Sequence, residues 1–316
     1  MYRKIMGFLE AWKENEHRKP LILQGARQVG KTYSILEFGR IHYENVAYFN
    51  FETNPKLNET FEEKISPDYL IPILSHIAGQ TIVKEKTLIV FDEVQLCERA
   101  LTSLKYFCED APDYHIIVAG SLLGVAVNRA KFSFPVGKVD MKTLYPMDME
   151  EFMIAMGEDE LVEQIKKCFE TNRPMPSALH DAAMQLYRQY LVVGGMPECV
   201  MQFVQTGDYI LIRHTQDTIL TSYLNDMGKY NNLNAIKKTR LAYDNITVQL
   251  SKKNTRFQYK LIKKGGRASE FENAIEWLCL SGIASQVYRV EQIKKPLENY
   301  RDIDAFKIYV SDLGLL

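Results

Sequence analysis

The stretch that decides the fold is Gly25-Ala26-Arg27-Gln28-Val29-Gly30-Lys31-Thr32, which fits the pattern G-x-x-x-x-G-K-[ST]. The apolar run 20–24 before it predicts a short buried strand, and residues 33–40 after it predict a helix. In such a strand–loop–helix, glycines let backbone N–H groups curl around phosphates at the positive end of the helix dipole. Lys31 would reach the β- and γ-phosphates, and the Thr32 hydroxyl would bind Mg²⁺. We therefore expect these eight residues to bind ATP or ADP with Mg²⁺.

The composition predicts a globular intracellular protein. With 316 residues, 46% of them hydrophobic and 25% charged, the chain is long enough for two or three domains with real cores. Its five cysteines lie far apart with no C-x-x-C pair, which predicts buried thiols in a reducing cytoplasm. The longest uncharged run, 116–128, is too short for a membrane span, and residues 1–12 predict an amphipathic helix rather than a signal peptide. A peripheral membrane role stays open.

A second motif lies at residues 87–93, where the apolar run Thr-Leu-Ile-Val-Phe ends in Asp92 and Glu93. This is the Walker B pattern, in which a buried parallel strand delivers an acid to the edge of the sheet beside the phosphate loop. We expect Asp92 to hold Mg²⁺ through water and Glu93 to act as the general base for an attacking water. A phosphotransferase has no use for that second acid, so the pair favours an ATPase over a small-molecule kinase.

A third apolar run, 115–119, predicts another strand and is followed by Gly120 and Ser121. A polar residue at that edge, between the two nucleotide motifs, can hydrogen-bond the γ-phosphate or the attacking water. Ser121 is our candidate for this sensing role. It could equally cap the N-terminus of a following helix, and the two roles are compatible.

The order of these motifs resembles a known family. GARQVGKT, LIVFDEVQ (88–95) and IIVAGSLLG (116–124), followed by FPVGK (134–138) and LYPM (144–147), look like the AAA+-type P-loop ATPases of bacteria and archaea. In particular, the chain resembles a branch in which the AAA domain precedes a helical and winged-helix region, labelled a domain of unknown function. It covers nearly the whole chain and implies a strand order of 5-1-4-3-2. Members usually continue into a nuclease-like domain, so we expect either a truncated chain or one without that domain.

The resemblance also implies an arginine supplied from a neighbouring subunit, which stabilises charge in the transition state. Arg129, shortly after the third strand, is the candidate, and Lys138 lies in the same stretch. A plain surface cation is the alternative for both.

The rest of the chain predicts helices and then a helix with a β-hairpin. We expect an α/β parallel-sheet domain over 1–150, a helical lid or linker region over 151–235 and a winged-helix-like domain over 236–316. The run 193–197, Val-Gly-Gly-Met-Pro, predicts a tight turn between helices. Ser269 and Glu272 predict a capping box at the start of a later helix, with β-rich runs at 283–290 and 305–310.

Basic residues are concentrated in one segment of this last region. Residues 236–267 hold ten Lys and Arg against Asp244 as the only acid. A solvated helix face explains this, and so does contact with DNA. Three glutamates on the later helix, Glu270, Glu272 and Glu276, would repel phosphates and favour docking to a protein instead.

Three functions compete. The first is an ATP-hydrolysing AAA+ ATPase whose nucleotide state drives a change that acts on DNA or a partner protein, or that depends on self-association. The second is a regulatory switch that holds nucleotide and turns over slowly. The third is a DNA-binding protein in which the nucleotide is mainly structural.

Overall fold

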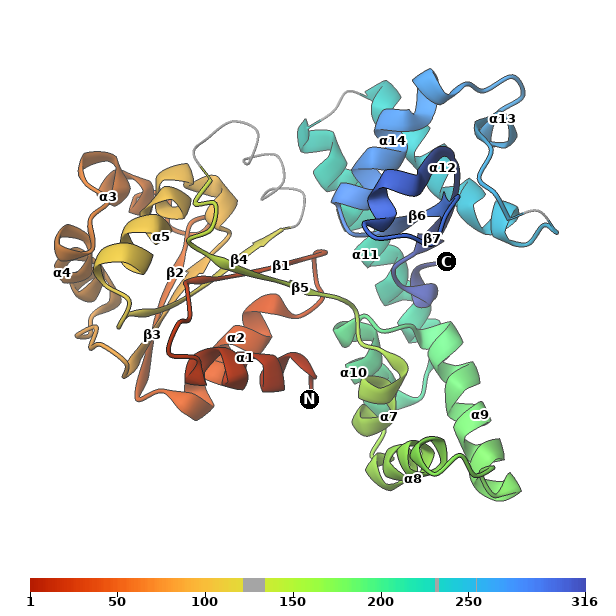
Figure 1. Cartoon of the computed structure of the whole chain (residues 1–316), viewed down its shortest axis with the longest axis horizontal. Helices are drawn as coiled ribbons and strands as arrows, with labels where there is room; N and C mark the ends of the chain where they lie inside the picture. The colour runs from red at the N-terminus through yellow and green to blue at the C-terminus, as the bar shows by residue number, and fades with distance from the viewer. Residues whose placement is uncertain (122–133, 231–232, 254) are drawn as a thin grey trace. The chain divides into compact units, whose positions relative to one another are not determined.

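The computed structural model describes residues 1–121, 134–230, 233–253 and 255–316. It divides into two compact units, Met1–Tyr145 and Pro146–Leu316 (Figure 1). The division falls five residues before the predicted boundary at 150, and the further division at residue 235 stays a prediction. In the parts of the chain described, no helix is long and apolar enough to cross a lipid bilayer.

The first unit is built on a five-stranded sheet in the order β2-β3-β4-β1-β5. All four strand pairs are parallel, so every strand directs its carboxyl end to the same edge. Read from the other side, this is the order 5-1-4-3-2 that the family resemblance implies. The strands are β1 (Leu21–Gly25), β2 (Asn45–Asn50), β3 (Thr87–Asp92), β4 (His115–Ser121) and β5 (Asp140–Leu144).

Helices cover this sheet and enclose an apolar core. Strands β3 and β4 are buried along their full length, as expected of interior parallel strands. Helix α1 packs beside α2, whereas α3 and α4 pack beside α5 (Figure 1). The phenylalanines Phe49, Phe51, Phe61 and Phe91 meet edge-on or tilted in the core on the side of α3 and α5. The helices are α1 (Ile5–Glu14), α2 (Lys31–His42), α3 (Leu57–Glu63), α4 (Pro67–Ala78) and α5 (Glu98–Asp110), with the short 3-10 turn η1 (Val94–Leu96).

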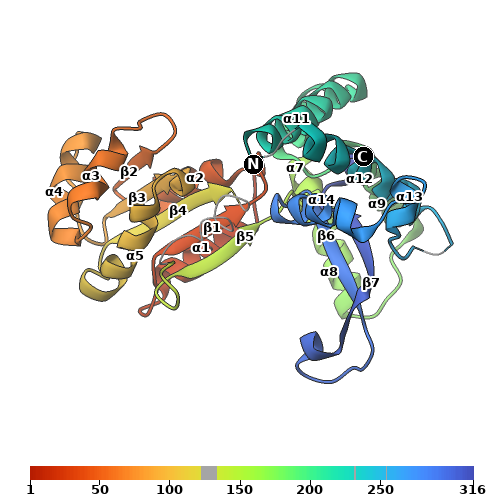
Figure 2. The same cartoon turned by 90° about the horizontal axis from the view of Figure 1, so that it is seen from above.

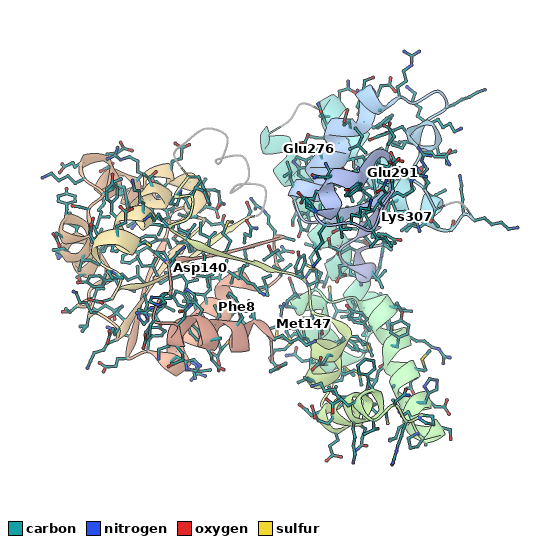
Figure 3. All side chains as sticks on the ribbon, in the orientation of Figure 1. Phe8, Asp140, Met147, Glu276, Glu291 and Lys307 are labelled. Atoms are coloured by element: carbon teal, nitrogen blue, oxygen red, sulfur yellow. The ribbon has the colours of Figure 1, made fainter. Side chains whose placement is uncertain are left out.

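The second unit begins with helices. The predicted turn at 193–197 is confirmed, since Gly194 has a φ of 75° and connects α9 to α10. A side chain on Gly195 would strike the backbone of Met147, which Figure 3 labels. The buried Asp312 carboxylate accepts a hydrogen bond from the Gly195 N–H and so fixes this turn. The helices are α7 (Met149–Ala155), α8 (Asp159–Glu170), α9 (Ser177–Val193), α10 (Pro197–Thr206) and α11 (Tyr209–Tyr230).

Three further helices and an antiparallel hairpin complete this unit. The Phe257 N–H donates to the Phe306 carbonyl at 2.8 Å, so a short extended segment lines the edge of the hairpin. Figure 2 shows the connection between the two strands projecting from the hairpin. This order of elements agrees with a winged helix, which stays a prediction. The elements are α12 (Leu233–Leu250), α13 (Tyr259–Ile262), α14 (Ala268–Leu280), β6 (Ala284–Val290), η2 (Leu297–Tyr300), β7 (Arg301–Val310) and η3 (Leu313–Leu315).

Two local predictions in this region were wrong. Helix α14 has Arg267 as its N-cap residue, with no side-chain cap, so Ser269 already lies inside the helix and forms no capping box. Ala268, a strong helix former, extends the helix toward the N-terminus. Strand β7 begins at Arg301, four residues before the predicted run, because it pairs with β6 across a register shift at Tyr288/Arg289.

Candidate nucleotide-binding site

The phosphate loop joins β1 to α2 at the carboxyl edge of the sheet. Gly30 is the N-cap residue of α2 with a φ of 89°, a conformation that favours glycine. Gly25 is fixed for another reason, because a Cβ there would clash with the Leu144 carbonyl oxygen on the neighbouring strand β5. Both glycines of the motif are therefore required by backbone geometry. Of the residues between them, Ala26 and Val29 are buried, Arg27 is half-buried and Gln28 is exposed.

The Lys31 ammonium is held within the loop. It donates to the carbonyls of Ala26 at 2.8 Å and Gly25 at 3.2 Å. Burial lowers the pKa of Lys31 to about 8, although the carboxylates of Glu93 and Asp92 act in the opposite direction. A cation held this way is well suited to exchange carbonyl contacts for phosphate oxygens.

The Walker B aspartate meets the loop directly. Thr32 donates its hydroxyl to Asp92 Oδ2 at 2.9 Å, and Asp92 is 5% exposed at the end of β3. A hydroxyl and a carboxylate oxygen side by side are hard ligands of the kind Mg²⁺ prefers, so the residues present fit this ion. Thr32 and Asp92, the two residues expected to bind Mg²⁺, thus lie in contact although 60 residues separate them in the sequence.

Tyr48 also contacts the aspartate. From β2, its hydroxyl donates to Asp92 Oδ2 at 2.6 Å, and it accepts from the Asn50 side-chain amide at 3.1 Å. Burial and this bond to Asp92 raise the pKa of Tyr48 to about 12, so the hydroxyl keeps its proton and remains a donor. Tyr48 and Thr32 together fix the orientation of the carboxylate.

Glu93 follows the strand in a left-handed conformation, with φ 52° and ψ 39°. The backbone therefore leaves the direction of β3 at Glu93, whose side chain is half-buried. The Glu93 N–H donates to Asp92 Oδ1 at 3.0 Å. The carboxylate accepts a hydrogen bond from the Gln95 side-chain amide. The predicted base is therefore held in place from η1.

The other predicted residues have different outcomes. Ser121 is the last residue of β4, 8% exposed and in register with Gly25, so it reaches the edge where the phosphate loop begins. Arg129 lies outside the described residues. Lys138 pairs with Glu109 at 2.9 Å and is therefore engaged on the surface.

The sequence reasoning missed two residues, Tyr48 and Arg3. Arg3 is 3% exposed and donates to the Val29 carbonyl at 2.8 Å and to the Tyr145 carbonyl at 2.7 Å. It therefore ties the N-terminal segment to the back of the phosphate loop. Its position three residues from the N-terminus gives no signal of these contacts.

Comparisons with known proteins agree with this geometry. Residues 17–153 match the family model of an AAA domain, and residues 184–316 match a domain of unknown function. A Walker-type ATPase of Pyrococcus abyssi is similar in structure, with 14% identity, a TM-score of 0.58 and coverage of 99% of this chain and 94% of that one. No curated protein sequence matches.

Two further solved structures are similar at TM-scores below 0.5. The Orc1 protein of Aeropyrum pernix in complex with DNA has 13% identity, a TM-score of 0.36 and coverage of 98% and 87%. The RuvB Holliday junction branch migration motor of Thermotoga maritima has 13% identity, a TM-score of 0.37 and coverage of 89% and 87%. Of these three structures, the Pyrococcus ATPase is the one that supports the fold. With the loop, the Walker B aspartate and the strand order, these findings show that the first unit has the P-loop ATPase fold and that its residues 17–153 match the model of an AAA domain.

Proposed function

We propose that the chain hydrolyses ATP with Mg²⁺ at the edge of the first unit's sheet. The observation that carries this proposal is the hydrogen bond between Thr32 and Asp92, with Lys31 held in the same loop. Two elements 60 residues apart place a hydroxyl, a carboxylate and an ammonium together. That set corresponds to the phosphate and metal contacts of P-loop ATPases.

The side chains then have distinct tasks. The loop N–H groups and Lys31 hold the phosphates, and the oxygens of Thr32 and Asp92 hold Mg²⁺. When bound, Mg²⁺ supplies positive charge next to the phosphate oxygens. Ser121, in register with the first loop residue, contacts the γ-phosphate or the attacking water.

Glu93 removes the proton from the attacking water. Its carboxylate is oriented by Gln95, and general-base catalysis of this kind contributes about 10²–10⁴-fold to rate. We retain Arg129 as the candidate arginine for a neighbouring active site, which depends on self-association.

The nucleotide state is proposed to act on DNA or a protein through the second unit. Seven cations from the basic segment are exposed there and form the proposed phosphate-contacting set: Lys252, Lys253, Arg256, Lys260, Lys263, Lys264 and Arg267. These exposed cations are the observation that favours another candidate function, a DNA-binding protein in which the nucleotide is mainly structural. The cytoplasm stays the predicted location.

Turnover and nucleotide affinity of three variants test the proposal. Lys31→Ala is expected to lose ATP affinity, and Glu93→Gln to keep affinity while kcat falls by about 10²-fold or more. Glu52→Gln, at an exposed glutamate after β2, is the matched control and should behave as wild type. Unchanged ATP affinity in Lys31→Ala would refute the site.

The same measurements separate the alternatives. ADP that survives purification with negligible turnover would favour a slow regulatory switch. Salt-sensitive DNA affinity that is unchanged in Lys31→Ala would favour the DNA-binding protein.

A further inference from the structure

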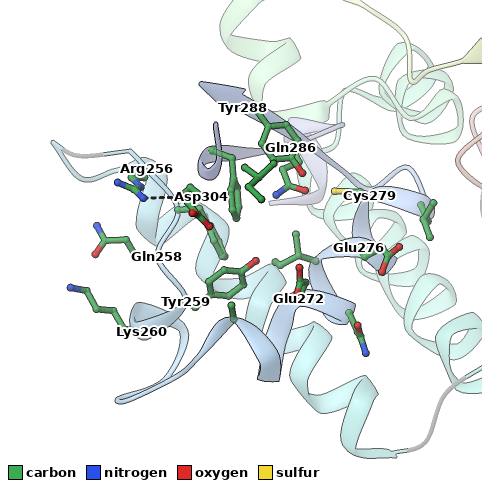
Figure 4. A pocket seen from close by; sticks show the side chains of 17 residues that line it. Arg256, Gln258, Tyr259, Lys260, Glu272, Glu276, Cys279, Gln286, Tyr288 and Asp304 are labelled. Carbon is green, nitrogen blue, oxygen red and sulfur yellow. Dashed lines mark hydrogen bonds between the residues drawn. The ribbon is translucent and has the colours of Figure 1, made fainter. Parts of the chain in front are cut away.

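A large groove lies in the second unit, and none of its lining residues belongs to the nucleotide site. Its volume is about 1070 Å³, and it lies between one side of α14, the β6–β7 hairpin and the segment 256–260 (Figure 4). The floor is apolar, because Phe257, Ile275 and Phe306 line it and are each less than 7% exposed. An open groove with a hydrophobic floor can accept side chains from outside.

One wall of the groove is acidic. Glu272 and Glu276 project from successive turns of α14 into it, and both are exposed (Figure 4). Like charges four residues apart on a helix destabilise it by about 0.2–0.5 kcal/mol. Neither glutamate has an ion-pair partner in the ranges the structure describes. A cation from outside would relieve their repulsion.

Tyrosines complete the binding surface. Tyr259 and Tyr288 are half-buried and line the groove from opposite sides (Figure 4). Burial, and after it the Glu272 carboxylate, raises the pKa of Tyr259, which agrees with the two groups facing one space. Aromatic rings beside carboxylates are suited to the stem and the charged end of a lysine or arginine.

The opposite rim carries the basic side chains. Arg256 and Lys260 lie on that rim, and Arg256 donates to the Asp304 carbonyl at 2.7 Å (Figure 4). The carboxylates are thus separated from the cations across the groove. DNA lying against the α14 wall would bring phosphates onto two unpaired carboxylates.

The length of the groove defines the size of its occupant. Along α14 the lining runs from Ala268 to Leu280, which corresponds to roughly 18 Å at ~1.5 Å per residue. An extended peptide covers this length with about five residues at ~3.3 Å each. The groove volume also lies slightly above the range for small-ligand sites, roughly 300–1,000 Å³.

We propose that this groove docks a short extended segment of a partner protein, with a lysine or arginine of that segment between Glu272 and Glu276. The inference goes beyond ATP hydrolysis and rests on the second unit alone. It assigns the α14 face to a protein, whereas Lys252, Lys253, Lys263, Lys264 and Arg267 are exposed and do not line the groove.

A pair of labelled peptides tests this. The probes are an eight-residue peptide of alternating lysine and leucine and its glutamate–leucine counterpart, titrated against the full chain by fluorescence anisotropy. We expect only the lysine peptide to bind, and the double variant Glu272→Lys/Glu276→Lys to weaken it at least tenfold. The matched control, Glu291→Lys/Glu298→Lys, reverses two exposed glutamates of the hairpin connection outside the groove and should bind as wild type.

Thiol protection locates the bound peptide. Cys279 lines the groove and is a free, half-buried thiol, and Cys168 on α8 is a free, half-buried thiol outside it. The lysine peptide is expected to slow alkylation of Cys279 and leave Cys168 unchanged, as followed by mass spectrometry. Basal ATP turnover should be the same in the double variant, so the two proposals fail separately.

Three results would overturn the inference. They are equal affinity for both peptides, affinity unchanged by Glu272→Lys/Glu276→Lys, and binding without protection of Cys279. The milder pair Glu272→Gln/Glu276→Gln keeps side-chain size, so a loss of binding there cannot come from misfolding caused by added charge.

Discussion

Removing the Arg3 guanidinium is expected to weaken ATP binding although Arg3 does not belong to the loop motif. In a trans peptide the carbonyl and the following N–H point in opposite directions. Because Arg3 holds the Val29 carbonyl at 2.8 Å, it also fixes the direction of the Gly30 N–H at the start of α2. We expect that N–H to be one of the donors to phosphate.

The magnitude follows from the two hydrogen bonds. Each bond from a charged group contributes about 1.5–3 kcal/mol, so Arg3→Ala should lower the free energy of unfolding of the first unit by roughly 3–6 kcal/mol. Fixing a freed backbone residue on binding costs about 1–2 kcal/mol. At ~1.4 kcal/mol per factor of ten, ATP affinity should fall by about 5- to 30-fold.

A fluorescent ATP analogue titrated against wild type, Arg3→Ala and Arg3→Lys provides the assay. Lysine keeps the charge but cannot reach both carbonyls with a planar fork, so it should recover only part of the affinity. Arg40→Ala, at an exposed arginine on α2 that pairs with Glu37, is the matched control. If Arg3→Ala unfolds at a lower temperature yet binds within twofold of wild type, Arg3 is structural and the reasoning fails.

Three other perturbations have defined outcomes. Gly25→Ala should lower the free energy of unfolding by about 3 kcal/mol, because the added Cβ would clash with β5. Gly7→Ala on α1, where nothing lies near the added Cβ, should be neutral or stabilising. Denaturant titration measures both effects. Burial lowers the pKa of Lys31 to about 8, and the negative charge of a bound phosphate should raise it again. Above pH 8 the binding of ATP should therefore take up a proton, and ATP affinity should fall as pH rises. Calorimetry in two buffers measures this proton uptake. Burial raises the pKa of Asp312 to about 6, above its value in the unfolded chain, so its stabilising contribution is present at low pH and lost as pH rises through 6. Asp312→Asn should therefore raise the unfolding temperature more at pH 7 than at pH 5.

Each of these can fail in a specific way. Equal effects of Gly25→Ala and Gly7→Ala would mean that β5 yields without cost. Absence of proton uptake above pH 8 would mean that Lys31 is fully charged before ATP binds. An Asp312→Asn effect that is the same at both pH values would mean that this carboxylate does not titrate in that range.

The parts of the site that were predictable are those encoded by contiguous residues. The loop at 25–32 and the pair Asp92-Glu93 follow from strand, glycine and acid patterns, and the strand order followed from the family resemblance. Their meeting was predictable too, because parallel strands end at one edge.

The parts that were missed depend on distant contacts. Tyr48 reaches Asp92 across 44 residues, and Arg3 reaches Tyr145 across 142. Nothing in the neighbouring sequence distinguishes either from an ordinary surface side chain. The capping box at Ser269 failed because local propensity fixes a helix start only to within a residue or two.

The left-handed backbone of Glu93 implies a conflict between stability and activity. A non-glycine residue in this conformation costs roughly 1–2 kcal/mol, and glycine would avoid most of that cost. Selection for a more stable chain alone would therefore favour Glu93→Gly, which also removes the proposed base. A library of variants screened for stability alone should therefore enrich this inactive substitution. Its depletion under selection for function would measure how much the organism depends on ATP hydrolysis.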